Sequence, residues 1–365
     1  MRITCVKLHD YRSYTELEIR PSSGLNVIVG PNAAGKTNVL EAIFLSALGR
    51  SHRTSRDAEL INHSSRGGFV CIELESRTGS HRIEIKLREG VNKQVLVDGK
   101  KLRRMGELMG VLNVVMFSPE DLSLVKDSPQ ERRRFMDMEL CQLRPAYFYG
   151  LQQYNAALKQ RSSLVKDSFP VPPDPDLIEA WDARLSMLGG DIMLVRNEFM
   201  DDLSTIAHDL HRRITGGREQ LFAYYKPNVP FEEGEARRAV YQALAMSHDE
   251  DIRRGYTTRG PHRDDIGLKL GETDVRIYGS QGQQRTAALS LKLSEIALMR
   301  RDKGESPVLL LDDVLSELDV DRQRELLSSA FDCQCFLTTT ALDGLENVPD
   351  MTVFECNEGR VSRIK

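Results

Sequence analysis

The chain has few of the features that mark several large classes of protein. Its 365 residues contain one tryptophan and only 6% aromatic residues. No apolar run approaches the roughly 20 residues that a membrane-spanning helix needs. The six cysteines are scattered without metal-ligand spacing, which indicates reduced structural thiols. The segment Met1–Leu8 has the pattern of a strand and not of a signal peptide, so we expect a globular, cytoplasmic protein without a membrane partner.

The chain also lacks an excess of positive charge. It has 50 Lys and Arg residues against 54 Asp and Glu residues, a net charge of -4. A DNA-binding protein with this balance would depend on local basic patches. No helix-turn-helix, zinc-finger pattern or aromatic stacking stripe appears, so DNA binding should be independent of base sequence and sensitive to salt. Each basic cluster is either a phosphate-binding patch or an ordinary solvated face, and the clusters lie at Arg50–Arg56, Lys100–Arg104 and Arg132–Arg134.

Both ends of the chain have the pattern of α/β structure, and this sets the expected fold class. Short apolar runs with the character of strands lie there next to helical segments. The main expected elements are a buried strand over Leu25–Val29, a helix over Thr37–Leu48, a strand over Val275–Ile277, a helix over Gln281–Met299, and buried strands over Pro307–Leu311 and Cys335–Thr338. A helical region separates the two ends, so we expect an α/β head of mixed sheets that is split by an insertion.

The middle of the chain changes to a helical period at Pro129. From Trp181 to Leu210 apolar residues recur at intervals of three and four, with one irregularity at Phe199–Leu203, as in the seam of a coiled coil. A proline-rich stretch at Phe169–Asp176 must interrupt any helix. This pattern fits a helical hairpin that forms a short coiled-coil-like arm, and it fits an ordinary helical subdomain equally well. The expected domains are a head of residues 1–125 and 255–365 and a helical arm of residues 126–254.

One motif carries most of the functional information. The segment Gly30–Thr37 has the sequence Gly-Pro-Asn-Ala-Ala-Gly-Lys-Thr and lies between a buried strand and a helix, which is the setting of a phosphate-binding loop. In such a loop the backbone N–H groups face an anion, the lysine reaches the β- and γ-phosphates, and the threonine hydroxyl binds magnesium. We therefore expect a nucleoside triphosphate with Mg²⁺ here. The candidate residues are Gly30, Asn32, Gly35, Lys36, Thr37 and Asn38.

A second motif supplies the carboxylates that a triphosphate site needs. The apolar strand Leu309–Leu311 ends in Asp312 and Asp313. Asp312 would hold the magnesium ion, directly or through water, and Asp313 would polarise the attacking water. Such a strand end is weak evidence alone, since an ordinary turn explains it equally, but it becomes strong beside the phosphate-binding loop. The catalytic candidates are Lys36, Asp312 and Asp313, and the candidate metal ligands are Thr37 and Asp312.

A third motif, Ser280–Arg285, lies at the start of the expected helix Gln281–Met299. A serine and free amides at a helix N-terminus form an anion site, although a simple helix cap by Ser280 would give the same pattern. The chain thus carries two half-sites for phosphate that are far apart in sequence. They are explained if two protomers face each other and each completes the nucleotide site of the other. The candidate residues are Ser280, Gly282 and Gln283.

The segment Gly260–Asp265, with the sequence Gly-Pro-His-Arg-Asp-Asp, contains a histidine beside two carboxylates. This composition could serve a metal or nuclease site. No second ligand cluster with matching spacing is visible in the sequence. We therefore prefer a structural role for His262, at the junction of arm and head.

Taken in order, these motifs resemble the head of ABC-type ATPases, and the helical insertion is similar to that of SMC-like DNA-repair ATPases. Further segments along the whole chain resemble the RecF family of recombination mediators. They are Leu8–Tyr14, Ser51–Thr54, Phe117–Leu122, Arg132–Asp137 and Gly260–Asp265. Gln281 stands where the transporter consensus has glycine, and the helical arm is short. Both features favour the RecF branch.

The resemblance implies a weak, DNA-stimulated ATPase that acts as a switch. An ATP-bound homodimer would bind double-stranded DNA near single-strand gaps, and slow hydrolysis would release it. Implied partners are RecR with RecO, and RecA indirectly, in fork recovery and SOS induction. Arg12 and Arg53 would contact the adenine or ribose, and Ser280, Gly282 and Gln283 would contact the γ-phosphate of the partner's ATP. Thr338–Thr340 occupies the place where relatives carry a switch histidine.

Other machines share these nucleotide motifs. The ATPase subunit of a transporter would have its motifs closer together, without an arm between them. An ATP-dependent nuclease of the OLD type would need an appended metal-dependent domain, which we do not expect between the last motif and Lys365. An SMC-like architectural clamp with vestigial hydrolysis stays open, because Asp313 stands in place of a glutamate base.

Overall fold

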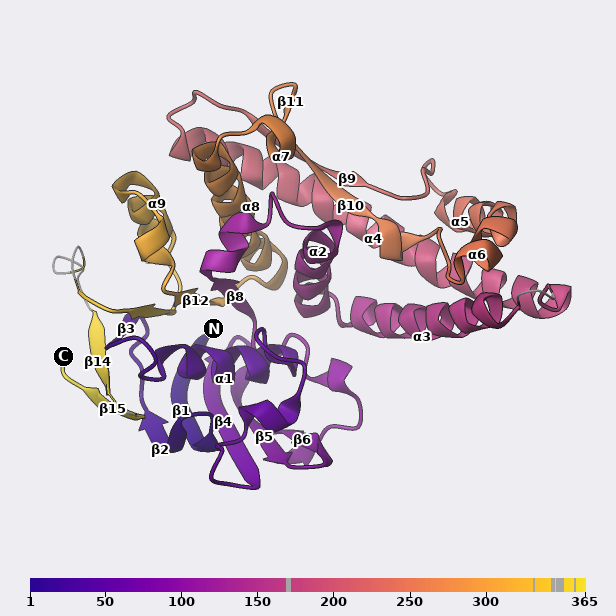
Figure 1. The fold of residues 1–365 in the computed structure, drawn as a ribbon. Coiled ribbons are helices and arrows are strands. Elements are labelled where there is room, and N and C mark those ends of the chain that lie inside the picture. Colours follow the sequence, from indigo (N-terminus) through magenta and orange to yellow (C-terminus); the bar gives the residue numbers. More distant parts are fainter. Residues whose placement is uncertain (169–171, 331, 343–344, 346–350, 358) are drawn as a thin grey trace. The chain divides into compact units, whose positions relative to one another are not determined.

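A largely parallel sheet assembled from both ends of the chain lies at the centre of the first part of this computed structural model (Figure 1). The structure describes residues 1–168, 172–330, 332–342, 345, 351–357 and 359–365. The chain divides into two compact units, Met1–Leu122 with Ala288–Lys365, and Ser123–Ala287. The helical insertion expected over 126–254 lies within the second unit. Residues 255–287, expected in the head, fall in the second unit as well.

The central sheet of the first unit has the strand order β15-β14-β3-β13-β12-β8. Strand β3 is parallel to both of its neighbours, with Leu25 opposite Cys335 on one side and Asn26 opposite Thr352 on the other. Strands β3, β12 and β13 are apolar and almost wholly buried, as expected for a parallel sheet that is covered on both faces. The bounds are β3 Leu25–Val29, β8 Val114–Phe117, β12 Val308–Asp312, β13 Cys335–Thr339, β14 Thr352–Asn357 and β15 Arg360–Arg363.

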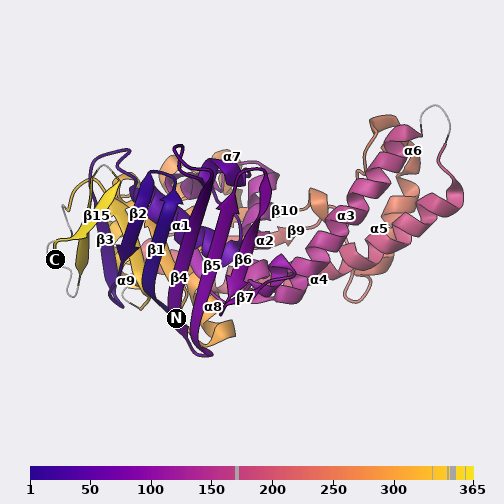
Figure 2. The same cartoon turned by 90° about the horizontal axis from the view of Figure 1, so that it is seen from below.

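A second, antiparallel sheet of the first unit has the order β2-β1-β4-β5-β6-β7, and Figure 2 shows most of its strands side by side. Along β5, Ile83, Ile85 and Leu87 are buried while Arg82 and Lys86 are exposed, so one face of the sheet packs on the core and the other meets solvent. The bounds are β1 Arg2–Tyr11, β2 Tyr14–Ile19, β4 Gly67–Ser76, β5 Gly79–Arg88, β6 Val91–Val97 and β7 Lys100–Lys101.

Helix α1, Lys36–Leu48, contacts strands of both sheets. The structure buries this helix all round, from Val39 to Leu48. A helix between two sheets has no solvent face, which explains why even Glu41 within it is buried. The other helices of this unit include most of α8, Gln281–Lys303, which begins in the second unit, and α9, Val320–Ala330.

The second unit is built around a long helical hairpin. Helix α3, Pro145–Asp167, is followed by the proline-rich stretch and by α4, Pro175–Ile214, whose start is capped by Asp174. Residues 169–171 of the expected break lie outside the described part. Helix α4 contacts α5 and strand β9 as well as α3, so its apolar seam serves several neighbours rather than one coiled-coil partner. The remaining bounds are α2 Pro129–Leu143, β9 Leu221–Lys226, α5 Ala236–Met246, α6 His248–Arg254, β10 Asp265–Leu270, β11 Thr273–Asp274 and α7 Val275–Tyr278. Among the described residues, none of the helices combines the length and apolar character needed to cross a membrane.

The strand predicted over Val275–Ile277 is wrong. These residues begin the short helix α7, because the Asp274 carboxylate accepts a hydrogen bond from the Arg276 backbone N–H at 2.9 Å and caps the turn. The sheet of this unit instead has the order β11-β10-β9, with Tyr225 opposite Ile266.

Buried arginines bind distant parts of the second unit together. Arg132, predicted within a basic surface cluster, is 1% exposed and donates to both Asp265 carboxylate oxygens at 2.6 and 3.1 Å. Its neighbour Arg133 donates to the Asp264 carbonyl at 2.6 Å. The cluster Arg132–Arg134 is therefore largely structural, since a guanidinium in such pairs is not free to meet DNA phosphate.

His262 also has structural partners. Its Nδ1 lies 2.7 Å from the Tyr154 hydroxyl and its Nε2 lies 3.0 Å from the Thr257 carbonyl oxygen. Among the described residues there is no group of three or more His, Cys, Asp or Glu side chains that could hold a metal ion. Burial lowers the pKa of His262 to about 4. The ring is therefore neutral in the folded protein at neutral pH.

This low pKa predicts a pH-dependent stability. Between the ordinary value of 6.5 and the folded value of about 4, the unfolded chain binds a proton that the folded chain does not, so stability falls as the pH falls through this range. We expect the contribution of His262 to lower the unfolding free energy by about 2 kcal/mol when the pH falls from about 7.5 to about 5. Urea unfolding of the wild type and His262→Gln at both pH values measures this, and the variant should lose that part of the dependence. An identical pH dependence in both proteins would contradict the assignment.

Candidate nucleotide site

The loop between β3 and α1 contains two glycines at positions where a side chain would not fit. A Cβ atom on Gly30 would lie 2.1 Å from the Cys356 carbonyl oxygen. Gly35 has a left-handed φ of +111°, and a Cβ there would lie 2.6 Å from Ser13 Oγ. Both glycines are thus required by the geometry, and Asn32 is exposed at the tip of the loop.

Two buried side chains that we did not predict as functional support this loop from behind. The Tyr14 hydroxyl donates to the Gly35 carbonyl at 2.9 Å, and the Cys356 thiol lies 3.3 Å from the Ala34 carbonyl oxygen. Burial raises the pKa of both groups, so they stay protonated and can act as donors. Tyr14 belongs to the quoted segment Leu8–Tyr14, but no local signal points to Cys356, whose strand β14 pairs with β3.

Lys36 lies at the start of α1 and is 7% exposed. Its Nζ donates to the carbonyls of Gly30 and Pro31 at 2.8 and 2.9 Å, so the ammonium group is curled over the loop. These acceptors are neutral, and a phosphate oxygen would be a stronger partner for the same ammonium. The N-terminus of α1 begins at the same residue, and the first backbone N–H groups of a helix lack acceptors within the preceding turn, so a cation and a helix N-terminus meet here in a setting for an anion.

Thr37 and Asp312 meet at the carboxyl edge of the central sheet. The Thr37 hydroxyl donates to Asp312 Oδ1 at 2.9 Å, although 275 residues separate the two in sequence. Both side chains offer oxygen ligands of the kind that Mg²⁺ takes together with phosphate oxygens and water. This pair therefore fits a magnesium ion bound beside a triphosphate, with Thr37 and Asp312 as its protein ligands.

Thr338 is a further member of the site and was singled out in the sequence only as a replacement for a histidine. Its hydroxyl donates to Asp312 Oδ1 at 2.7 Å and accepts from the Asp313 backbone N–H at 3.0 Å. It is 1% exposed, on the strand next to β12. Thr338 thus orients both aspartates at once.

Asp313 directly follows strand β12 and has a left-handed backbone, with φ of 51°. Burial raises the pKa of its carboxyl above the ordinary value, while the nearby Lys36 ammonium opposes this rise. A carboxylate whose pKa is raised, near the Lys36 ammonium, has the properties expected of a base for an attacking water.

Arg12 and Arg53 gather around the buried carboxylate of Glu41, which we did not predict. Arg12 donates to Glu41 through Nε at 2.8 Å and Nη2 at 2.7 Å, and Arg53 Nη1 lies 3.7 Å from the same carboxylate. Arg53 also donates to Asn38 Oδ1 at 3.1 Å. Burial alone would raise the pKa of Glu41, but hydrogen bonds from Arg12 and Ser51 outweigh it and hold the pKa below its usual value. A charged residue within the apolar stretch Val39–Leu48 is the sequence signal for this network.

The residues of the third motif lie in the second unit, whereas the loop and both aspartates lie in the first. Ser280 is exposed before α8, its Oγ accepts from the Gln283 backbone N–H at 3.2 Å, and its own N–H donates to Gln283 Oε1 at 2.9 Å. This reciprocal pair is a helix cap. Gln283 also donates to Glu219 at 2.9 Å, and Gly282 lies in the first turn of the helix.

Replacing Thr338 by valine should weaken the site while keeping the side-chain shape. The change leaves the Asp313 N–H without its acceptor and removes a donor to Asp312, which should cost about 1–3 kcal/mol of unfolding free energy. It should also weaken magnesium-dependent nucleotide binding, because Asp312 loses its orientation. Urea unfolding and titration with a fluorescent ATP analogue measure both effects. Thr338→Ser keeps the hydroxyl and is the matched control; equal losses in the two variants would show that the hydroxyl is unimportant.

Known proteins share both the sequence and the structure of this chain. The model of the RecF/RecN/SMC N terminal domain matches residues 2–360. The DNA replication and repair protein RecF of Alkaliphilus oremlandii is 42% identical over 98% of both chains, and that of Acetivibrio thermocellus is 43% identical over 95% of both.

Solved structures agree with this assignment. The recombination mediator protein RecF-ATPrS in the RecFOR pathway superposes with a TM-score of 0.93 at 34% identity, covering 100% of this chain and 98% of that one. The Smc head domain of Pyrococcus furiosus, at 17% identity and a TM-score of 0.57, shares the fold alone. The ABC/SMC-type ATPase head with its helical arm is therefore confirmed, and the chain belongs to the RecF family of DNA replication and repair proteins.

Proposed function

We propose that this protein is an ATP-dependent DNA clamp of recombinational repair. The observation that carries the proposal is the hydrogen bond between Thr37 and Asp312 at 2.9 Å, which brings a hydroxyl and a carboxylate together at one sheet edge, next to the loop over which Lys36 is curled. ATP is held by the loop amides and Lys36, with adenine or ribose towards Arg12 and Arg53. Magnesium is held by Thr37 and Asp312. RecF relatives solved with ATP and ATPrS support ATP as the nucleotide.

Hydrolysis is proposed to act as a slow release step. Asp313 accepts a proton from the attacking water, and Lys36 offsets the charge that develops on the γ-phosphate. Thr338 keeps the Asp313 backbone in place through its hydroxyl. The ATPase activity is expected to be weak and to be stimulated by DNA. An SMC-like clamp without significant hydrolysis is the alternative that the shared head fold allows.

Two protomers are proposed to complete each other's nucleotide sites. Ser280, Gly282 and Gln283 would contact the γ-phosphate of the partner's ATP. Support comes from Ser280, which is exposed before the first residue of α8, a helix of 23 residues whose positive dipole end favours an anion. The cap between Ser280 and Gln283 holds both side chains at that helix end.

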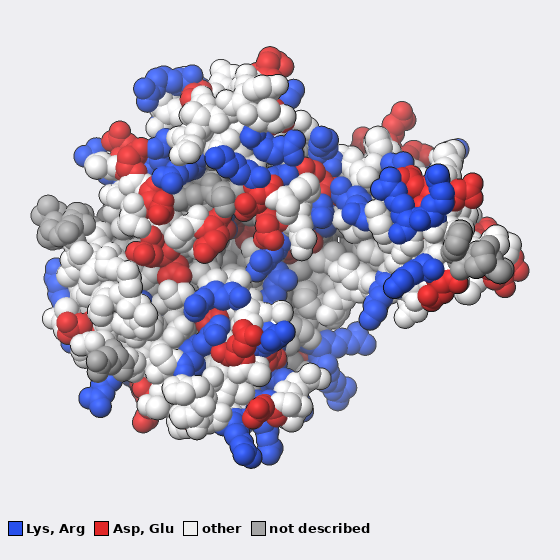
Figure 3. Space-filling model, viewed as in Figure 1, with Lys and Arg blue, Asp and Glu red and all other residues white. Residues whose placement is uncertain are grey.

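The DNA partner is proposed to be double-stranded DNA near a single-strand gap. Basic and acidic side chains are interspersed over the face in Figure 3, in line with the net charge of -4, so contact must come from local clusters. Lys100, Lys101, Arg103 and Arg104 are exposed and suit the phosphate backbone better than the buried Arg132. The RecFOR pathway of the solved relatives supports RecR and RecO as partners. The proposed outcomes are RecA loading, fork recovery and SOS induction, in the cytoplasm.

The clamp is tested by solution mass. Asp313→Asn should keep nucleotide binding while blocking hydrolysis, so magnesium ATP should double the mass measured by light scattering. Adding Ser280→Arg should abolish the doubling of mass, because an arginine at the interface between the two protomers would clash with the partner's nucleotide site. Ser163→Arg, an exposed serine of α3 in the same unit, is the matched control and should still dimerise. A mass that ignores ATP in Asp313→Asn would rule out the composite site and favour a monomeric ATPase.

A further inference from the structure

One face of strand β9 is exposed and carries two aromatic rings and a lysine. Residues on this strand alternate, with Leu221, Ala223 and Tyr225 buried. The exposed residues are Phe222 and Tyr224, each 42% exposed, and Lys226. Large exposed rings side by side on a strand are unusual unless a ligand covers them. The rings stand two residues apart in the sequence, and only the strand geometry of Leu221–Lys226 brings them to one face.

The neighbouring strand β10 makes room for one of these rings. Gly267 lies opposite Tyr224, and a Cβ atom on Gly267 would lie 2.0 Å from Tyr224 Cζ. The phenol ring therefore lies against the backbone of Gly267, where any other residue would displace it. This contact fixes the ring position on an otherwise open face and leaves part of the ring accessible.

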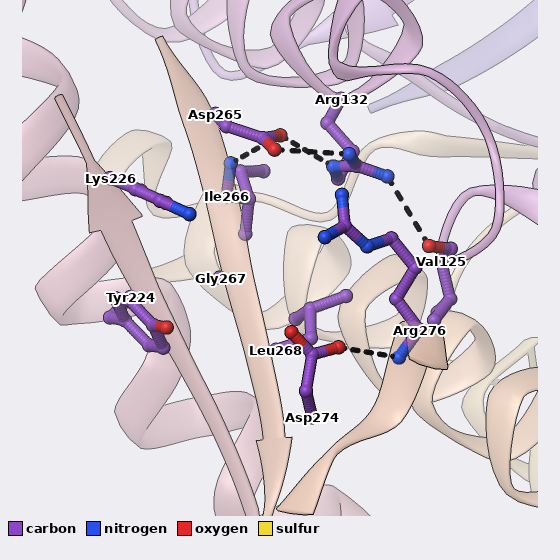
Figure 4. A pocket seen from close by; sticks show the side chains of 10 residues that line it. All are labelled: Val125, Arg132, Tyr224, Lys226, Asp265, Ile266, Gly267, Leu268, Asp274 and Arg276. Atoms are coloured by element: carbon purple, nitrogen blue, oxygen red, sulfur yellow. Dashed lines mark hydrogen bonds and ion pairs between the residues drawn. The ribbon is translucent and has the colours of Figure 1, made fainter. Parts of the chain in front are cut away.

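Cations surround the same place. Tyr224 and Lys226 lie on one side of Gly267 in Figure 4, with Arg132 and Arg276 on the other side of β10, around a shallow hollow. Among the described residues, the side chains of Lys226 and Arg276 have no hydrogen-bond or ion-pair partner. The carboxylates of the hollow are already engaged, Asp265 by Arg132 and Asp274 by the Arg276 backbone N–H.

We propose that this face of the second unit, formed by Phe222, Tyr224, Lys226, Gly267 and Arg276, binds single-stranded DNA. Bases would stack on the accessible rings, and the phosphates would meet Lys226 and Arg276. The proposal rests on the function proposed above and deepens it, since a clamp at a gap junction meets a single strand beside the duplex.

The combination of groups favours a single strand over other occupants. In a duplex the bases are stacked on each other, so exposed rings on a flat sheet would find no free base face. An acidic protein segment would use the cations but would leave the rings unused. An unpaired strand offers both base π-faces and phosphate charges, and this face carries the two rings Phe222 and Tyr224 together with the cations Lys226 and Arg276.

The test measures fluorescence anisotropy of a labelled oligo(dT) of about 12 nucleotides with the full-length protein. Tyr224→Ala should weaken binding about tenfold, whereas Tyr224→Phe keeps the ring and should bind like the wild type. Lys226→Ala should reduce the slope of log affinity against log salt by about 0.7. Gly267→Ala should weaken binding although it removes no ring, because the added methyl group displaces Tyr224.

Matched controls and a duplex arm separate this proposal from the general one. Tyr256→Ala and Lys159→Ala change exposed residues of the same types in the same unit and should leave oligo(dT) binding unchanged. Binding of duplex DNA with magnesium ATP should survive Tyr224→Ala. Unchanged oligo(dT) affinity in Tyr224→Ala and Lys226→Ala, or equal loss for oligo(dT) and duplex, overturns the single-strand site. If Tyr224→Ala and Lys226→Ala lose RecR binding but keep oligo(dT) binding, the single-strand site is also overturned, and the face is assigned to a protein partner. Failure of the wild type to bind duplex would instead contradict the clamp.

Discussion

The parallel pairing of β3, β13 and β12 is the constraint on which the nucleotide site depends. Because parallel neighbours end at the same edge of a sheet, the loop after β3, Thr338 near the end of β13 and the aspartates at the end of β12 must meet there. The hydrogen bonds of Asp312 to Thr37 and to Thr338 follow from that arrangement. Remove the pairing and each motif is an ordinary turn.

The same constraint explains how far the sequence could be interpreted. Strand β3 and the start of α1 were predicted almost residue by residue, because the apolar run, the glycines and Lys36 are contiguous. Thr338 was mentioned only for what it replaces, since its partners become neighbours through strand pairing alone. Glu41 carried a local signal, a charge in an apolar helix, but its partner Arg12 is 29 residues away. Local sequence patterns were thus enough to predict the loop. The residues that hold it in place become neighbours only through long-range contacts.

Charge was harder to interpret than hydrophobicity. Arg132 looked like part of a surface patch, but its partner Asp265 is 133 residues away. Arg161 and Arg196 are equally buried, and they donate to Asp251 and Asp264 at separations of 90 and 68 residues. The position of a buried guanidinium group depends on the carboxylate with which it pairs. No periodicity in the sequence identifies that carboxylate. The wrong strand at Val275–Ile277 had a similar origin, because the single cap at Asp274 outweighed β-branched residues.

The order of the central sheet has a consequence for synthesis on the ribosome. The neighbours of β3 are β13 and β14, and the neighbour of β8 is β12, so the N-terminal strands of this sheet meet only strands from the last sixth of the chain. Until residue 308 has emerged, β3 and β8 have none of these hydrogen-bonding neighbours, while 123–287 is contiguous and can form its own core. The nascent chain therefore carries the apolar strand β3 without its sheet neighbours for most of its translation, whereas the antiparallel sheet β2-β1-β4-β5-β6-β7 is complete once residue 101 has emerged.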